Sequence, residues 1–130
     1  MLSYRAAIKK LCFEAGLSYS ENIFDLEHVP ATIRHKHFYI MKPNRVPAED
    51  ISSDQTICTD KLIVRSIWLL NTTNDIELCE EFMDILTQNL IDISECDYGI
   101  MWKGTESEYT DNNKYYITDI ELSVERRLVD

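Results

Sequence analysis

The closing stretch of the chain, KYYITDIELSVERRLVD at residues 114–130, alternates between apolar and polar positions. Alternation with a period of two is typical of a strand that buries one of its faces. We therefore expect a fixed strand of a sheet here, not a loose tail. Its inward face would carry Tyr116, Thr118, Ile120, Leu122 and Val124, and its outward face Asp119, Glu121, Ser123 and Glu125.

A first helix is predicted over residues 3–15, where apolar residues recur at steps of three and four. Ser3 is placed to accept a hydrogen bond as the N-cap of this helix. Gly16 follows its last turn, where a glycine commonly ends a helix. The segment therefore has both a start signal and a stop signal.

A second helix is predicted over residues 75–93, with Asn74 as its N-cap and Glu77 completing a capping box. Acids near the N-terminus of a helix suit its dipole, and Glu80, Glu81 and Asp84 lie on the outward face. The inward stripe at steps of three and four consists of Cys79, Phe82, Met83, Leu86, Asn89, Leu90 and Ile93.

Three further strands are predicted from short apolar runs at residues 35–42, 61–70 and 98–103. Irregular chain is expected over 17–33, around Pro30, and in a turn over 104–113. Residues 43–60 are polar, contain two prolines and predict a long loop. The order is α-β-β-α-β-β, which indicates one two-layer α+β domain over residues 1–130. Its sheet is expected to be antiparallel or mixed, with two helices on one face and the long loop between the first two strands.

Charge gives information about binding partners. The chain of 130 residues has a net charge of −10, which is unevenly distributed along the sequence. Residues 1–48 carry seven Lys or Arg and four acids, whereas residues 49–130 carry six and nineteen. An acidic field repels free nucleic acid, which excludes a conventional DNA-binding module. No apolar run reaches the roughly 20 residues of a membrane span, and none resembles a signal peptide. We expect a soluble protein made in a cytoplasm.

Residues capable of catalysis or metal binding do not form a recognisable site. His35 and His37, between Arg34 and Lys36, lack further ligands at a useful spacing, so they indicate a basic surface that contacts a phosphate or an acidic neighbouring subunit. The four cysteines form no CxxC pair and are expected to be reduced; Cys12 and Cys79 fall on inward stripes, which favours core packing over nucleophilic chemistry. Three glycines leave no phosphate-binding loop. We expect no enzyme, metal site or cofactor.

The order of elements, the segment FDLEHVPATI at residues 24–33, the long loop after the first strand and the final TDIELSVERR together resemble the tail terminator proteins of long-tailed bacteriophages. In that family a small α/β subunit forms a hexameric ring that caps the tail tube, stops its growth and supplies the surface on which the head docks. The resemblance implies a virion protein of the tail or neck, assembled in the host cytoplasm. Its partners would be copies of itself, the tail tube protein below and a neck or head-completion protein above. DNA would pass through the ring without specific binding, and no membrane would be involved.

A ring subunit needs complementary surfaces, and the uneven charge offers a basic edge to the acidic edge of the next subunit. Acidic walls let DNA slide, because phosphates gain no counterion-release energy from carboxylates; Asp119, Glu121 and Glu125 are therefore predicted to face the lumen or an adjoining ring. The 43–60 loop is expected to reach a neighbour or the tube. Residues predicted for the subunit interface are Arg34, His35, Lys36, Arg45, Glu49, Asp50, Asp54, Arg126 and Arg127. The alternative for Arg126 and Arg127 is a solvated strand end.

Three other functions stay open. Another phage neck or tail-completion protein would share the same features. A small acidic inhibitor that imitates DNA would need carboxylates spread along one face, whereas the acids here fall on a helix, two loops and a strand. A small enzyme of ferredoxin-like fold would need a pocket with a titratable group of perturbed pKa, and no residue suggests one.

Overall fold

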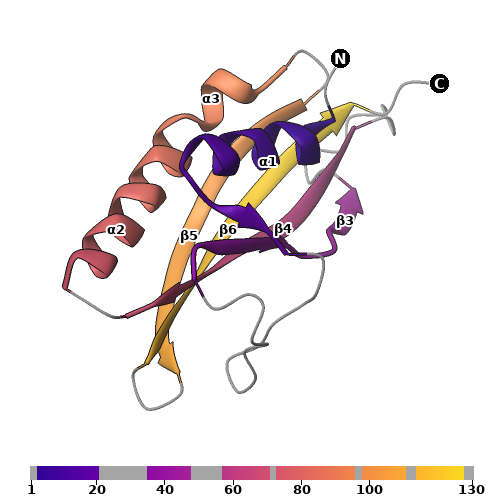
Figure 1. Ribbon diagram of the computed structural model, residues 1–130. Coiled ribbons are helices and arrows are strands. Elements are labelled where there is room, and N and C mark those ends of the chain that lie inside the picture. The colour runs from indigo at the N-terminus through magenta and orange to yellow at the C-terminus, as the bar shows by residue number, and fades with distance from the viewer. Residues whose placement is uncertain are drawn as a thin grey trace.

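Three strands of thirteen residues form the centre of the fold (Figure 1). The computed structural model describes residues 3–20, 35–47, 57–70, 73–95, 98–110 and 114–127. These residues form a single α+β domain with a mixed six-stranded sheet and three helices. The strands are β1 (Ser18–Tyr19), β2 (His37–Ile40), β3 (Asn44–Pro47), β4 (Ile57–Leu69), β5 (Tyr98–Thr110) and β6 (Tyr115–Arg127); the helices are α1 (Tyr4–Glu14), α2 (Thr73–Gln88) and α3 (Leu90–Ile93).

The sheet has the order β1-β2-β4-β6-β5, with β3 paired to β4 as well. Its main ladder joins β4 to β6 in antiparallel register from Ile57 opposite Arg127 to Leu69 opposite Tyr115. β5 pairs antiparallel with β6 and is a terminal strand, and β1 with β2 is the parallel pair. Figure 1 shows the helices together on one side of this sheet. The predicted class and mixed sheet are therefore correct.

The core lies between the helices and one face of the sheet. The predicted inward face of β6 is confirmed, because Thr118, Ile120, Leu122 and Val124 have no exposed surface and Tyr116 packs against the same core. Side chains from both long helices complete it: Ile8, Leu11 and Cys12 from α1 and Cys79, Phe82 and Leu86 from α2. Burying each of these large apolar side chains stabilises the fold by about 1.5–3 kcal/mol.

The opposite face of the sheet is not uniformly polar. Near the start of β6 it carries a small second cluster of the buried residues Ile67, Tyr115 and Ile117, with Tyr39 and Leu69 packed against them. The acids of that face come later along the same strand, at Asp119, Glu121 and Glu125. The period-two pattern therefore places the faces correctly but understates how much of the outward face is apolar.

The first helix has the predicted ends. The Ser3 hydroxyl accepts a hydrogen bond from the Ala6 N–H at 3.2 Å, as an N-cap does. Gly16, with φ of 92°, occupies the left-handed conformation that ends many helices. Both signals could be recognised because each depends on residues within one turn of the helix end.

The second helix differs from its prediction at both ends. It begins at Thr73, so Asn74 is the second helical residue and not the N-cap. It ends at Gln88, and the short α3 follows after Asn89, whose φ of −105° and ψ of 11° depart from helical values. The Asn89 side-chain amide donates to the Ile85 carbonyl at 2.6 Å. Such local hydrogen bonds compete with the helix, which explains the break inside a continuous apolar stripe.

Several strands extend into segments predicted as loops, so the α-β-β-α-β-β order is incomplete. β1 lies within the predicted irregular segment, β3 within the predicted 43–60 loop, and β5 continues through most of the predicted 104–113 turn. The predicted first strand, 35–42, is shorter, since only His37–Ile40 pairs. β4 starts at Ile57 instead of residue 61. Polar residues in exposed positions obscured these strands, because a strand at a sheet edge needs few apolar side chains. The Pro30 turn lies outside the described residues.

Among the parts of the chain that the structure describes, no helix combines the length and the apolar character that crossing a membrane would require.

Ile120 tests the assignment of the core face of β6. It is fully buried at the centre of the β4–β6 ladder, so Ile120→Ala should lower the free energy of unfolding by about 2–5 kcal/mol. Glu121→Ala, the matched change on the next, exposed residue, should alter it by less than about 0.5 kcal/mol. Urea denaturation measures both. Equal effects of the two substitutions would contradict the assigned faces.

Candidate functional site

Charge is separated across the sheet. On the β1–β2–β3 side, residues 3–20 and 35–47 carry six basic residues and one acid: Arg5, Lys9, Lys10, Lys36, Lys42 and Arg45 against Glu14. Residues 73–95, which form α2 and α3, and residues 98–110 of β5 carry nine acids and one lysine: Asp75, Glu77, Glu80, Glu81, Asp84, Asp92, Glu95, Glu106 and Glu108 against Lys103. The central β4 and β6 segments, 57–70 and 114–127, are nearly balanced, with five basic residues and four acids. We call the two flanks the basic side and the acidic side.

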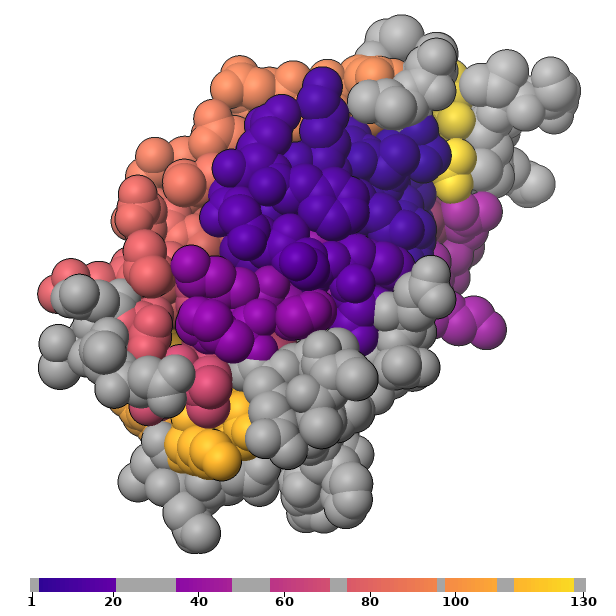
Figure 2. Space-filling view, viewed as in Figure 1, coloured from indigo at the N-terminus to yellow at the C-terminus, as the bar shows by residue number. Residues whose placement is uncertain are grey.

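The two sets of charged residues are furthest apart at the edges of the sheet, whereas α1 contacts both α2 and α3. α1 packs against β1, and α3 packs against β5 at the other end of the strand order. Figure 2 shows the atoms of α1 and β2 next to each other in the centre of the view, with α2 along its left margin. The uneven charge of the sequence therefore persists between the two edges of the sheet, whereas the packed helices bring both signs together.

The acidic side consists of the outer face of α2 and the strand β5. Helical spacing turns Cys79, Phe82 and Leu86 into the core. The same spacing leaves Glu77, Glu80, Glu81 and Asp84 exposed, and Glu106 and Glu108 are exposed on β5. Their negative field extends about 10 Å at an ionic strength of 0.1 M. This side is suited to a basic partner.

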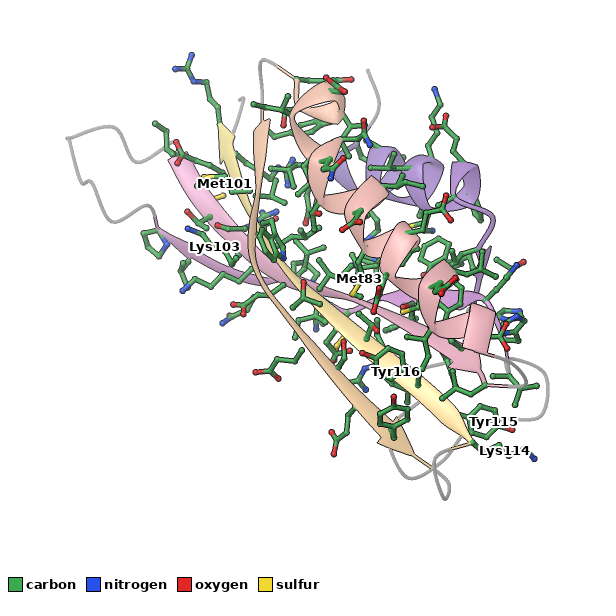
Figure 3. All side chains as sticks on the ribbon, turned by 90° about the vertical axis from the view of Figure 1, so that its left-hand side faces the viewer. Met83, Met101, Lys103, Lys114, Tyr115 and Tyr116 are labelled. Carbon is green, nitrogen blue, oxygen red and sulfur yellow. The ribbon has the colours of Figure 1, made fainter. Side chains whose placement is uncertain are left out.

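Exposed apolar side chains accompany these acids on β5 and α3. Met101, Trp102 and Tyr109 on β5 are 57%, 51% and 48% exposed, and Ile91 on α3 is 80% exposed. An open groove of about 550 Å³ lies where Ile91, Gly99 and Met101 meet the end of β6. Figure 3 shows Met101 and Lys103 beside β5, away from Met83, which lies between α2 and the sheet. Apolar residues exposed next to a strand edge are a feature of interaction surfaces.

The basic side holds some of its cations in intramolecular contacts. Arg5 donates to the Ile40 and Met41 carbonyls at 3.1 and 3.2 Å, and the Lys9 ammonium lies 3.9 Å from the centre of the Tyr19 ring. Lys10 and Lys42 are exposed. These exposed lysines are the ones best placed to meet an acidic partner.

Two residues predicted for the subunit interface, Arg45 and Arg126, converge on Asp60 inside the subunit. Arg45 Nε and Nη2 lie 2.6 and 2.9 Å from the Asp60 carboxylate, and Arg126 Nη1 lies 3.8 Å from it. The Tyr4 hydroxyl of α1 donates to the same carboxylate at 2.8 Å. Asp60 itself has no exposed surface. The cluster therefore ties α1, β3, β4 and β6 together through one buried charge.

The protonation of this cluster follows from its contacts. The hydrogen bond from Arg45, helped by that from Tyr4, holds the pKa of Asp60 below its ordinary value although burial acts in the opposite direction. Burial and the neighbouring carboxylate raise the pKa of Tyr4 to about 12. At neutral pH Asp60 is thus an anion and Tyr4 a neutral hydrogen-bond donor. The arrangement is an ion-pair cluster that links the strands and α1, with Asp60 buried and Arg45 partly exposed.

Asp119, predicted to face the lumen, is paired within the sheet. Arg65 Nε and Nη2 lie 2.7 and 2.8 Å from its two carboxylate oxygens, and the two residues stand directly opposite each other on β4 and β6. Glu121 and Glu125 lie on the same face and are exposed, as is Arg127 at the end of the strand. Of the three predicted lumen acids, only Glu121 and Glu125 therefore present an exposed carboxylate.

His35 joins the beginning of β2 to the end of β4. Its Nδ1 accepts a hydrogen bond from the Leu69 N–H at 3.0 Å, and its Nε2 lies 4.0 Å from an Asp75 oxygen. Burial lowers the pKa of His35, despite the opposing charge of Asp75. His37 is half-buried, with its Nδ1 2.7 Å from the His35 carbonyl oxygen. Lys36 between them has φ of 53°, a left-handed conformation that is uncommon for lysine.

The remaining predicted interface residues, Arg34, Glu49, Asp50 and Asp54, lie outside the described residues. Cys12, Cys58 and Cys79 are free thiols in the core, which confirms the predicted packing of Cys12 and Cys79, and Cys96 is outside the described residues. Burial raises the pKa of the Cys79 thiol to about 11, so little reactive thiolate forms there at neutral pH. Within the described ranges, no three His, Cys, Asp or Glu side chains gather as metal ligands would.

Comparison with known proteins gives no assignment, since neither a family model nor a curated protein sequence matches this chain.

The sequence reasoning missed Asp60 because it began the second strand at residue 61. Continuing the period of two backwards from Val64 and Leu62 would have placed Asp60 and Cys58 on the inward face. An acid on a core face requires a partner, since a buried unpaired charge is very costly. The need of a buried Asp60 for a partner could therefore have indicated a cluster with basic residues such as Arg45 and Arg126.

The buried charge of Asp60 can be tested with Asp60→Asn. This substitution removes two charge-assisted contacts, so it should lower the free energy of unfolding at pH 7 by about 3 kcal/mol. The folded-state pKa is depressed, so the carboxylate contributes its full stability above the unfolded pKa of about 3.9 and loses it as the pH falls further. The difference between wild type and variant should therefore shrink below about pH 4.

The control for Asp60 is Asp84→Asn, the same change on an exposed acid of α2, which should shift stability by less than about 0.5 kcal/mol. Urea denaturation over a pH series measures both. A difference that does not depend on pH would contradict the role assigned to the charge.

His35 should make stability depend on pH near neutrality. Because its folded-state pKa is lowered, the unfolded chain takes up the proton first, so the contribution is complete above about pH 6.5 and declines as the pH falls below that value. In His35→Asn, the amide oxygen can replace Nδ1 as the acceptor without titrating. The unfolding free energy of the wild type should fall more steeply between pH 7 and pH 5 than that of the variant. Equal dependence of the unfolding free energy on pH in the two proteins would contradict the role assigned to His35.

Proposed function

We propose that this chain is the subunit of a homo-oligomeric ring of the tail-terminator type, which closes the head-proximal end of a phage tail tube and joins the tail to the neck. The observation that carries the proposal is the charge separation across the sheet. Six basic residues against one acid lie on α1 and the segments of β1, β2 and β3, and nine acids against one lysine lie on α2, α3 and β5.

This separation favours head-to-tail contacts. An isologous dimer brings the same patch of two subunits together, and here that would oppose like charges on either side. A heterologous contact brings the acidic side of one copy to the basic side of the next, and repetition of that contact gives a ring if the rotation closes and a filament if it does not. Charge complementarity of this kind contributes to orientation and to the rate of encounter.

The open face of the sheet is the surface that we assign to the lumen or to an adjoining ring. Helices cover the other face, and no described helix covers this one, although it is buried around Ile67, Tyr115 and Ile117 (Figure 1). Glu121 and Glu125 are exposed on it, whereas Arg65 neutralises Asp119. These carboxylates offer DNA no counterion-release energy, which suits passage without binding, and the exposed cations that β4 and β6 present on the same face are Lys61 and Arg127.

A DNA-mimicking inhibitor is the second candidate, and one observation favours it. The acids of α2 and β5 gather on one side of the fold, although in the sequence they are divided between a helix and a predicted turn. The basic side argues against a mimic, because it would attract the nucleic acid that such a protein must replace. A mimic works as a monomer or dimer, so the oligomeric state separates the two functions.

The test is the mass of the purified protein as a function of salt. At about 50 mM salt we expect a species of six copies of the 15.2 kDa chain, measured by light scattering, and sixfold annuli in negative-stain images. At about 1 M salt the screening length falls to about 3 Å, so the rings should dissociate. The control is the low-salt sample with glycerol added to the viscosity of the high-salt sample, which leaves the screening unchanged.

Each outcome has a separate meaning for the proposal. A monomer at every concentration and salt would exclude the ring and favour the mimic. Rings that are indifferent to salt would keep the assembly but exclude complementary charge as its basis.

A further inference from the structure

One edge of the strand β5 is unpaired along the second half of the strand, among the elements that the structure describes. It is the terminal strand of the sheet order, and its only strand partner among the described residues is β6. A terminal strand presents unpaired N–H and C=O groups that can template pairing with another chain. Proteins usually protect such edges, so the distribution of protection along β5 is informative.

The register shows which backbone groups of β5 point outward. Ile100 stands opposite Val124, and its N–H points away from β6 to the Ser94 hydroxyl at 3.0 Å. In an antiparallel ladder, alternate residues turn their backbone groups to alternate sides. Thr105, Ser107 and Tyr109 stand opposite Ile120, Thr118 and Tyr116, positions of β6 with the same parity as Val124. Their N–H and C=O groups therefore point outward as well.

Protection is confined to the first half of the strand. Tyr98 exchanges both backbone hydrogen bonds with Glu95, at 3.0 and 3.1 Å, and Ile100 is bound to Ser94. A β-bulge then shifts the register between Trp102 and Gly104. Chain segments, bulges and lysines are the usual devices against edge pairing, and the first half of β5 has all three, including Lys103 in the bulge. Residues from Thr105 onward have none of them in the described structure.

We propose that the outward edge of β5 from Thr105 to Thr110 forms backbone hydrogen bonds with the β3 edge of a second copy of this chain. The inference deepens the proposed function and rests on it, because it names the contact through which the ring closes. β3 lies at the opposite side of the sheet and pairs with β4 alone among the described strands; the backbone groups of Arg45 and Pro47 face outward, so its outer edge offers one N–H, from Arg45, and two carbonyls. The sheets of neighbouring subunits would then be continuous across each interface.

Charge and exposure identify the occupant as a second copy. Glu106 and Glu108 are exposed on this half of β5, and the exposed Lys42 lies two residues before β3. Tyr109 adds an aromatic side chain that is 48% exposed at the same edge. The acidic and basic sides of two copies thus bring complementary charges to the two strands. A β5–β5 pairing would instead oppose the glutamates, and like charges across strands are destabilising.

Proline substitution at Ser107 tests the backbone contact. Ser107→Pro removes one outward N–H and keeps the backbone bonds to β6, since proline is tolerated on an edge strand where its nitrogen faces away from the sheet; it also removes the hydroxyl contact to Thr118. Ser107→Ala is the matched control, because it removes the same hydroxyl and keeps the N–H. We expect the proline variant to assemble at least about tenfold more weakly than the alanine variant in a dilution series followed by sedimentation.

Amide hydrogen exchange checks that the proline result is not a folding defect. In the wild-type protein, the amides of Thr105, Ser107 and Tyr109 should gain protection as concentration rises and subunits associate. The amides of Glu106 and Glu108, which face β6, should already be protected in the monomer. Equal protection of the three outward amides in monomer and assembly would overturn the inference without any variant.

Mixing two charge variants tests the head-to-tail arrangement. Glu106→Lys with Glu108→Lys reverses the charge of the acidic strand, and Lys36→Glu with Lys42→Glu reverses that of the basic side, so each double variant carries the same charge on both surfaces. Alone, each should be monomeric, and a mixture should assemble into rings in which the two variants alternate, because the reversed charges are again complementary. A mixture that remains monomeric, or a variant that still forms rings, would overturn the inference.

The outcomes separate this inference from the function on which it rests. If the wild type forms rings while Ser107→Pro assembles as Ser107→Ala does, the β5–β3 contact is excluded and the ring stands. If the wild type does not associate at any concentration, both the contact and the ring are excluded.

Discussion

The antiparallel ladder between β4 and β6 is the constraint on which the rest of the structure depends. Its unbroken register over thirteen residue pairs fixes which side chains of both strands face the helices. A slip by one residue would move Ile120, Leu122 and Val124 from the core to the open face, so the apolar pattern strongly specifies the register. The two ladder strands are nearly neutral, and the charged elements flank them on opposite sides. The fold thereby turns a charge difference along the sequence into one between the two edges of the sheet.

Asp60 shows how one buried charge adds specificity to this apolar framework. A buried ion pair often stabilises a protein no more than well-packed apolar residues would, because desolvation offsets the attraction. It does, however, restrict the arrangements that satisfy it. The carboxylate is satisfied here only if Tyr4 of α1, Arg45 of β3 and Arg126 of β6 all come within reach of β4. A misplaced β3 would take the closest cation, Arg45, away from a buried charge, so the cluster favours the position of β3 that the proposed assembly requires.

The sequence predicted what local patterns encode and missed what depends on the sheet. The ends of α1, the inward faces of α2 and β6 and the α+β class follow from spacing and caps within a few residues. β1, β3 and the second half of β5 were missed, because their polar residues become strand only through pairing with a neighbour. The candidate interface changed for the same reason. Arg45, Arg126 and Asp119 read as free surface charges until the folded strands brought each of them to a partner.

The exposed glutamates of β5 determine which edge of another copy can pair with this strand. A bare strand edge invites indiscriminate pairing, and proteins commonly limit this with charge. Glu106 and Glu108 repel a second β5 edge but attract the basic side of another copy, so the same two carboxylates oppose one kind of association and favour the other. Because a subunit cannot reach its own opposite edge, the favoured contact must be made with another copy. Satisfaction of every edge then requires either an open filament or a closed ring, and a ring leaves no edge free to continue growth.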